Sequence, residues 1–116
     1  MNGKEKIMIV DDEKSVGDVV AEILHIYDYT TFRCDNGEEA LSELNRFGPD
    51  LVVTDFQMPV MDGLELTKIL KKEIPDLPVV ILTGRPDLVP ENGLVDMVIE
   101  KPYRIEEFLK KIKELI

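Results

Sequence analysis

Five polar residues stand at the ends of apolar runs, where buried strands would stop. They offer three carboxylates, one hydroxyl and one amine: Asp11, Asp12, Asp55, Thr83 and Lys101. The run before Asp55, Leu51-Val52-Val53, has the composition of a strand buried on both faces. Because an unpaired buried carboxylate is very costly, such a strand must stop where the charge appears. We therefore expect Asp55 at the carboxyl end of a central strand, facing a crevice.

These residue types predict metal-assisted phosphoryl transfer. Three carboxylates in one crevice repel one another unless a cation or a proton is present. Oxygen ligands without histidine or cysteine favour a hard cation, Mg²⁺ before Zn²⁺, and the chain has one histidine, His25, and one cysteine, Cys34. A nucleophilic carboxylate, a metal, a lysine and a hydroxyl together suit phosphoryl transfer. We expect an acyl phosphate on Asp55, and we expect Mn²⁺ to be able to replace Mg²⁺.

Each of these residues also has a purely structural alternative. An aspartate after a strand is commonly a cap or turn residue. Thr83-Gly84 alone would be a turn, and Lys101 alone would be solvated or paired with Glu100 or Asp96. A chemical role is favoured because all five residues fall at one edge of the predicted sheet. Outside this set, Cys34 is expected to be a small buried hydrophobe and His25 a surface residue.

The elements that must position these residues alternate between strand and helix patterns. Strand patterns cover residues 6–10, 29–34, 51–53, 79–82 and 94–99, and amphipathic helix patterns follow the first, second, third and fifth of them. This alternation predicts an α/β fold, a flavodoxin-like five-stranded parallel sheet in the order 2-1-3-4-5 with helices on both faces. In that order the ends of strands 1 and 3 flank the crevice, so Asp11 and Asp12 should meet Asp55 there.

Size and charge limit the classes of protein that fit. The 116 residues suit one domain, residues 1–116. A formal net charge of −10 argues against direct binding to nucleic acid or to anionic membranes. No apolar run approaches the roughly 18 residues of a membrane span, and no signal peptide precedes the first strand. We expect a cytoplasmic protein without membrane insertion, and a stand-alone module because the last helix pattern runs to Ile116.

Taken together, the motifs resemble those of the receiver domains of two-component response regulators, over nearly the whole chain. The resemblance rests on their order and approximate spacing: Asp11-Asp12, Asp55, Met58-Pro59, Asp62-Gly63, Thr83-Gly84 and Lys101-Pro102. It implies that Asp55 accepts a phosphoryl group from a sensor histidine kinase and that Thr83 and Lys101 contact that group. A further protein would receive the signal.

The same resemblance implies a ligand set for the metal. Asp12 is implied as a direct Mg²⁺ ligand, with Asp11 nearby or acting through water. Asp55 and the backbone carbonyl of Gln57 are implied as further ligands. The Lys101-Pro102 peptide bond is usually cis in this family, a form that a proline permits.

A docking surface for the kinase is predicted on two segments beside the crevice: Lys14, Ser15, Val16, Val19, Pro102, Tyr103 and Arg104. The apolar arc of helix 13–27 spans roughly 160°, wider than one core-facing stripe needs. Its edge, Val16 and Val19 with Ile26, would then stay exposed and could receive an amphipathic helix. The alternatives are that the final helix buries the whole arc and that Tyr103 is a half-buried packing residue.

Two features depart from the resemblance. Position 98, where the family often has an aromatic switch residue, is Val98, so the usual coupled motion of a threonine and an aromatic ring cannot occur. In segment 85–93, Pro86 could begin a helix, but Pro90 would fall inside it and Gly93 follows. We predict a fourth helix that is shortened or irregular, or a mobile loop. In the family this face commonly carries output or dimerisation.

Three other classes of protein share parts of this pattern. A haloacid-dehalogenase-like phosphatase usually has a second aspartate two residues after its nucleophile, where this chain has Gln57. A flavodoxin needs a phosphate-binding loop after strand 1, and the acids of Asp11-Asp12-Glu13 would repel that phosphate. An unphosphorylated pseudo-receiver scaffold would not need the intact acidic set.

Overall fold

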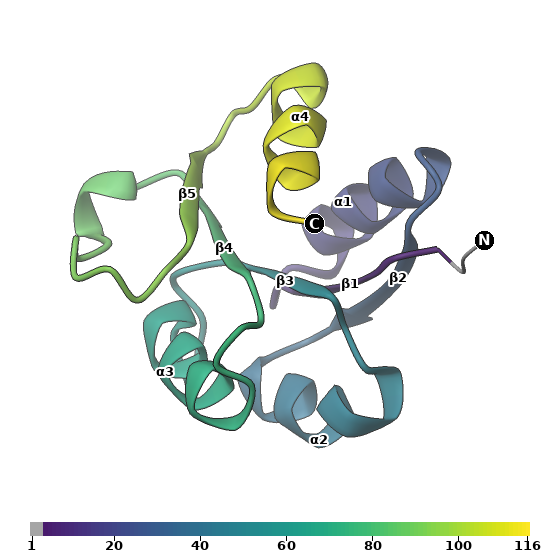
Figure 1. Ribbon diagram of the computed structural model, residues 1–116. Helices are drawn as coiled ribbons and strands as arrows, with labels where there is room; N and C mark the ends of the chain where they lie inside the picture. Colours follow the sequence, from purple (N-terminus) through teal and green to yellow (C-terminus); the bar gives the residue numbers. More distant parts are fainter. Residues whose placement is uncertain (1–3) are drawn as a thin grey trace.

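The strand patterns form one sheet, as predicted. The computed structural model describes residues 4–116. Its five parallel strands lie in the order β2-β1-β3-β4-β5 (Figure 1). The strands are β1 Lys6–Val10, β2 Thr30–Cys34, β3 Leu51–Thr54, β4 Val79–Thr83 and β5 Met97–Glu100. The predicted flavodoxin-like order 2-1-3-4-5 is therefore confirmed.

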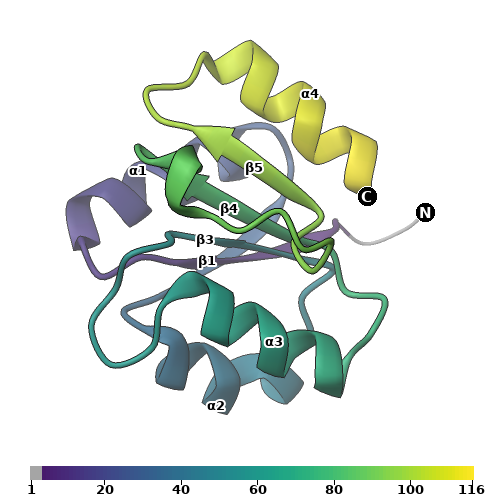
Figure 2. The same ribbon diagram turned by 90° about the vertical axis from the view of Figure 1, so that its left-hand side faces the viewer.

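Helices cover both faces of the sheet. Neighbouring strand residues point to opposite faces, and both faces carry apolar residues that must be buried. They are α1 Lys14–Ile26, α2 Gly37–Phe47, α3 Gly63–Glu73 and α4 Ile105–Leu115. Ile7 and Ile9 belong to the core cluster under α1 and α4, and Met8 and Val10 belong to the cluster under α2 and α3. Figure 2 shows these two layers above and below the sheet. No helix in residues 4–116 is long and apolar enough to cross a membrane.

Polar side chains begin α2 and α3, and a glycine ends α2. The Asn36 side chain accepts the N–H of Glu39 at 2.8 Å and begins α2, and Gly48 ends it with a φ of 65°. Asp62 and Glu65 form a reciprocal capping box at the start of α3. The Asp62 cap fixes where the loop after Asp55 ends.

The shortened fourth helix is also confirmed. Only a single 3₁₀ turn, η1 Pro86–Leu88, stands between β4 and β5. The fifth strand begins at Met97 and not at residue 94 as predicted. The reason is Asp96, whose carboxylate accepts the backbone N–H of Val79 at 2.8 Å and pairs with Lys71 at 2.6 Å. These contacts tie the residues before β5 to α3 and to the start of β4.

Candidate functional site

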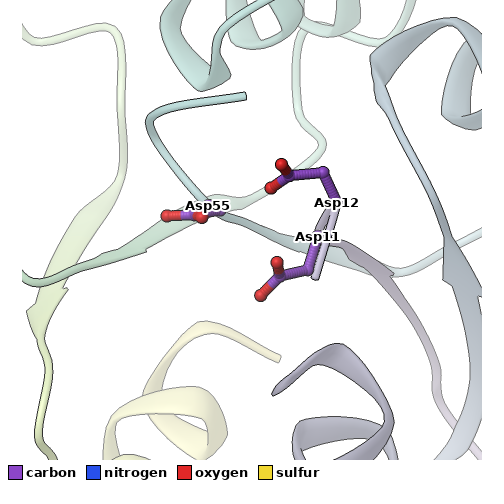
Figure 3. Close-up of side chains that lie close together, drawn as sticks. All are labelled: Asp11, Asp12 and Asp55. Atoms are coloured by element: carbon purple, nitrogen blue, oxygen red, sulfur yellow. The ribbon is translucent and has the colours of Figure 1, made fainter. Parts of the chain in front are cut away.

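Three carboxylates converge at the carboxyl ends of β1 and β3. The two strands pair with Val10 opposite Thr54, and the N–H of Asp55 donates to the carbonyl of Val10 at 2.9 Å. The residues that follow these strands are therefore neighbours. Carboxylate oxygens of Asp11, Asp12 and Asp55 lie within 4.8 Å of one another (Figure 3). Asp11 is buried, Asp55 is half-buried and Asp12 is exposed.

Asp55 is held by its own loop and by the first turn of α3. Its Oδ1 atom accepts the N–H of Phe56 at 2.8 Å, and the carbonyl of Phe56 accepts the N–H of Gly63 at 2.7 Å. A Cβ atom at Gly63 would overlap the backbone carbonyl oxygen of Asp55. Glycine is therefore required here for close approach. The Asp62-Gly63 motif by itself does not reveal this packing role, which depends on a contact with the backbone of Asp55.

Thr83 and Lys101 reach the same edge from β4 and β5. Thr83 is buried, and its Oγ1 atom accepts the N–H of Arg85 at 3.0 Å. The N–H of Lys101 donates to the carbonyl of Thr83 at 2.8 Å, and its Nζ atom lies 3.9 Å from Oδ1 of Asp55. The Lys101-Pro102 bond is cis, as the resemblance implied. Four strand ends thus bring all five predicted residues together.

Burial and neighbouring negative charges both raise the pKa values of carboxyl groups in this cluster. Burial raises the pKa of the Asp55 carboxyl above its usual range, while Lys101 acts in the opposite direction. Burial also raises the pKa of Asp11, against the hydrogen bond from the Glu13 N–H, and the Asp55 carboxylate raises it further. A cation among the three carboxylates would offset this repulsion. Their all-oxygen donor set suits Mg²⁺.

Gln57 and several residues outside the predicted site take varied positions. Gln57 lies in the connection between β3 and α3, with its side chain exposed. Arg85 forms a two-point ion pair with Asp87, through bonds of 3.0 and 2.8 Å, and both residues are exposed. Val98 lies half-buried on β5. Cys34 is buried, and burial raises the pKa of its thiol to about 12, which agrees with a packing role.

The predicted docking residues flank the crevice on two sides. Lys14 and Ser15 are exposed and Val16 is half-buried in the first turn of α1. Val19 is 54% exposed and Ile26 is 66% exposed, so α4 does not bury the whole arc.

The second docking segment follows the lysine of the crevice. Pro102 and Arg104 are exposed. Tyr103 is half-buried, and its ring packs on that of Phe108 with centroids 4.9 Å apart. This is the packing role that was given above as the alternative to docking.

The fold and crevice define a flavodoxin-like α/β module with an acidic site at its topological switch point. A family model described as "Response regulator receiver domain" matches residues 7–113. The chain belongs to this family.

Curated relatives agree with this assignment. The chain is 37% identical, over 97% of its length, to the probable transcriptional regulator ycf27 of Porphyridium aerugineum. It is 36% identical, over 96% of its length, to the response regulator MprA of Mycobacterium leprae. It covers 48% and 50% of these two proteins, so it spans about half the length of the curated relatives it matches.

Solved structures share the fold almost completely. The response regulator TrrA of Thermotoga maritima, solved in complex with Mg²⁺-BeF, superposes with a TM-score of 0.90 at 29% identity, covering 97% of this chain and 99% of that one. The chemotaxis protein CheY4 of Vibrio cholerae superposes with a TM-score of 0.89 at 25% identity, covering 98% and 100%.

Proposed function

We propose that this receiver domain accepts a phosphoryl group on Asp55 from a sensor histidine kinase, in a Mg²⁺-dependent reaction. The observation that supports this most strongly is the convergence of three carboxylates with the Lys101 amine 3.9 Å from Asp55. Packing alone does not require so many charged groups at the ends of four strands. The whole chain, residues 1–116, serves as this one domain.

The reaction is an exchange of one phosphorus bond for another. An Oδ atom of Asp55 attacks the phosphorus of the kinase's phosphohistidine, the P–N bond breaks, and the histidine nitrogen leaves with the bonding electron pair. Asp11, Asp12, Asp55 and the Gln57 carbonyl are the proposed metal ligands. When bound, Mg²⁺, or Mn²⁺ in its place, supplies positive charge to the phosphoryl oxygens. Lys101 and the Thr83 hydroxyl bind the same oxygens during and after transfer.

The signal leaves by a change of conformation. Phosphorylation replaces the single negative charge of the Asp55 carboxylate by a phosphoryl group that carries about two, and Lys101 and Thr83 bind this group. That binding biases a two-state equilibrium of the loops at the crevice. Val98 replaces the aromatic residue common at this position, and η1 replaces a full helix. The partner therefore recognises the change of conformation at a surface other than the face of the fourth helix. The downstream partner is a protein, in keeping with the net charge of −10, and we place this exchange in the cytoplasm.

The acceptor is tested with a small phosphoryl donor, which needs no docking surface. The protein is incubated with acetyl phosphate with and without Mg²⁺, and its intact mass is measured. We expect one phosphoryl increment that depends on Mg²⁺ and disappears in Asp55→Asn. Uptake by Asp55→Asn equal to that of the wild type would refute the assignment. No uptake by the wild type, under conditions where Mg²⁺ binds, would favour a pseudo-receiver.

Docking is tested separately with Val19→Glu. If α1 receives the kinase, this variant should slow transfer from the cognate phosphorylated kinase while leaving uptake from acetyl phosphate unchanged. Ile69→Glu is the matched control, because Ile69 is also an exposed apolar helix residue but lies on α3. Equal losses with both phosphoryl donors, or equal effects of the two variants, would count against a docking role for α1.

A further inference from the structure

Arg33 on β2 is the most heavily bonded cation near the crevice, although its sequence position gave no hint of a role. Its side chain is only 14% exposed. The guanidinium donates from Nε to Asp18 at 2.9 Å and from Nη2 to Asp35 at 2.7 Å. Its Nη1 atom donates to two backbone carbonyls, those of Asp11 at 3.2 Å and Cys34 at 3.4 Å. One side chain thus joins α1, the end of β2 and the end of β1.

The bond to Asp11 matters because of where that carbonyl lies. It belongs to the planar peptide unit that joins Asp11 to Asp12, so its direction places the N and Cα atoms of Asp12 and limits where the Asp12 side chain can point. The N–H of Asp11 is also fixed, since it donates to the carbonyl of Cys34 at 3.1 Å. Both backbone groups of Asp11 are therefore tied to the end of β2. Arg33 supplies the contact on the side nearer Asp12.

A glycine in α1 makes room for this arrangement. A Cβ atom at Gly17 would lie 2.8 Å from Cδ and 3.2 Å from Cγ of Arg33, and 3.1 Å from Cβ of Asp11. Glycine inside a helix costs roughly 0.5–1 kcal/mol relative to alanine. The absence of a side chain at Gly17 therefore leaves the space on α1 that the aliphatic part of Arg33 occupies.

We propose that Arg33 is a positioning residue that holds the Asp11–Asp12 peptide in the direction needed for Mg²⁺ binding. This inference rests on the proposed function, because it assumes that these carboxylates bind the metal. A purely stabilising ion pair would involve Asp18 and Asp35 alone and would leave the metal affinity of the folded protein unchanged. Supporting groups around metal ligands typically affect affinity by about 10–100-fold.

The test compares Mg²⁺ affinity with stability in the same variants. Arg33→Met keeps the aliphatic stem, and Arg33→Lys keeps the charge but cannot reach the separate partners of a guanidinium fork. The Mg²⁺ dissociation constant is measured by calorimetric titration, and unfolding without Mg²⁺ is measured by urea denaturation. We expect Mg²⁺ to bind about tenfold more weakly to both variants. Arg46→Met, which removes an exposed arginine paired with Glu43, should leave the affinity unchanged.

Gly17→Ala provides a second route to the same result if the arginine variants fold poorly. It keeps every polar group but presses on the Arg33 stem and on Cβ of Asp11, and we expect the same weakening of Mg²⁺ binding. An unchanged dissociation constant in folded Arg33→Met or Gly17→Ala, with only the stability lowered, would overturn the inference.

Asp12→Asn separates this inference from the proposed function. If Asp12→Asn weakens Mg²⁺ binding and the Arg33 variants do not, only the role of Arg33 is wrong. If the wild type fails to bind Mg²⁺ at all, both proposals are wrong.

Discussion

The Nζ atom of Lys101 lies 3.9 Å from Oδ1 of Asp55, too far for a hydrogen bond and close enough for an ion pair. The lysine is brought there by β5, and its backbone N–H is bonded to Thr83 at the end of β4. The amine lowers the pKa of Asp55 against the effect of burial. The amine thus favours the ionised form of Asp55, and no short bond holds the amine to the carboxylate.

Replacing Lys101 by methionine should slow phosphorylation of Asp55 by acetyl phosphate by roughly 10–100-fold. A charge-assisted bond to the transferred group contributes about 1.5–3 kcal/mol. The rate is followed by intact mass at saturating Mg²⁺. Lys110→Met is the control, since Lys110 is an exposed lysine on α4. Similar rates for the two variants would remove Lys101 from the reaction.

Without Mg²⁺, Asp55→Asn should be more stable than the wild type at neutral pH. A carboxyl whose pKa is raised by folding binds its proton more tightly in the folded chain. Its stabilising contribution is complete below the usual value of 3.8 and is lost as the pH rises through the folded-state pKa. Urea unfolding at neutral pH measures the difference, and the gain of the variant should shrink as the pH is lowered.

Mg²⁺ should make the wild type more stable than Asp55→Asn. At 100 times its dissociation constant, a cation that binds only the folded chain adds about 2.7 kcal/mol, and the variant should gain less. If Mg²⁺ does not stabilise the wild type, or if the difference between the two proteins does not change with pH, the proposed repulsion among the carboxylates and their binding of Mg²⁺ would be contradicted.

Gly63→Ala should destabilise the domain by about 1–3 kcal/mol, the usual cost of forcing extra volume into a packed site. The added Cβ atom would overlap the Asp55 carbonyl oxygen, so phosphorylation should slow as well. Gly84→Ala is the matched control. It lies at the same sheet edge, but a Cβ atom there meets nothing within 4 Å. A loss of stability in Gly84→Ala as large as in Gly63→Ala would show that the overlap is not the cause.

Much of this architecture could be predicted from residue patterns. The apolar runs ending at Asp55 and Thr83 fixed two strand ends, and the spacing of Pro86, Pro90 and Gly93 predicted the shortened fourth helix. The start of β5 could not be predicted, because the bonds of Asp96 to Val79 and Lys71 are made across the fold. The roles of Arg33 and Gly63 are likewise contacts between segments distant in sequence, and no local pattern encodes them.

Val60 shows a strain that sequence reading does not reveal. It follows the Met58-Pro59 pair, has a φ of 73° and is 76% exposed. A left-handed conformation costs a residue with a Cβ atom roughly 1–2 kcal/mol, and branching at Cβ makes it an outlier. Val60→Gly should therefore raise the free energy of unfolding by about 0.5–1 kcal/mol, after the entropy of a glycine in the unfolded chain is subtracted.

Gly93→Val provides the converse of that experiment. Gly93 has nearly the same backbone conformation, with a φ of 77°, and open space around its Cα. Valine there should lower stability by a comparable amount, measured by the same urea titration. If Val60→Gly were no more stable than the wild type while Gly93→Val lost stability, the strain at Val60 would be compensated by contacts of its side chain.

The most direct test of the central claim is chemical mapping of the phosphorylated residue. After incubation with acetyl phosphate and Mg²⁺, borohydride reduces an aspartyl phosphate to homoserine, and tandem mass spectrometry of the peptides locates it. We predict homoserine at position 55 and nowhere else, and none when Mg²⁺ is omitted. Homoserine at position 11 or 12, or phosphate retained on another side chain with position 55 unchanged, would contradict the account.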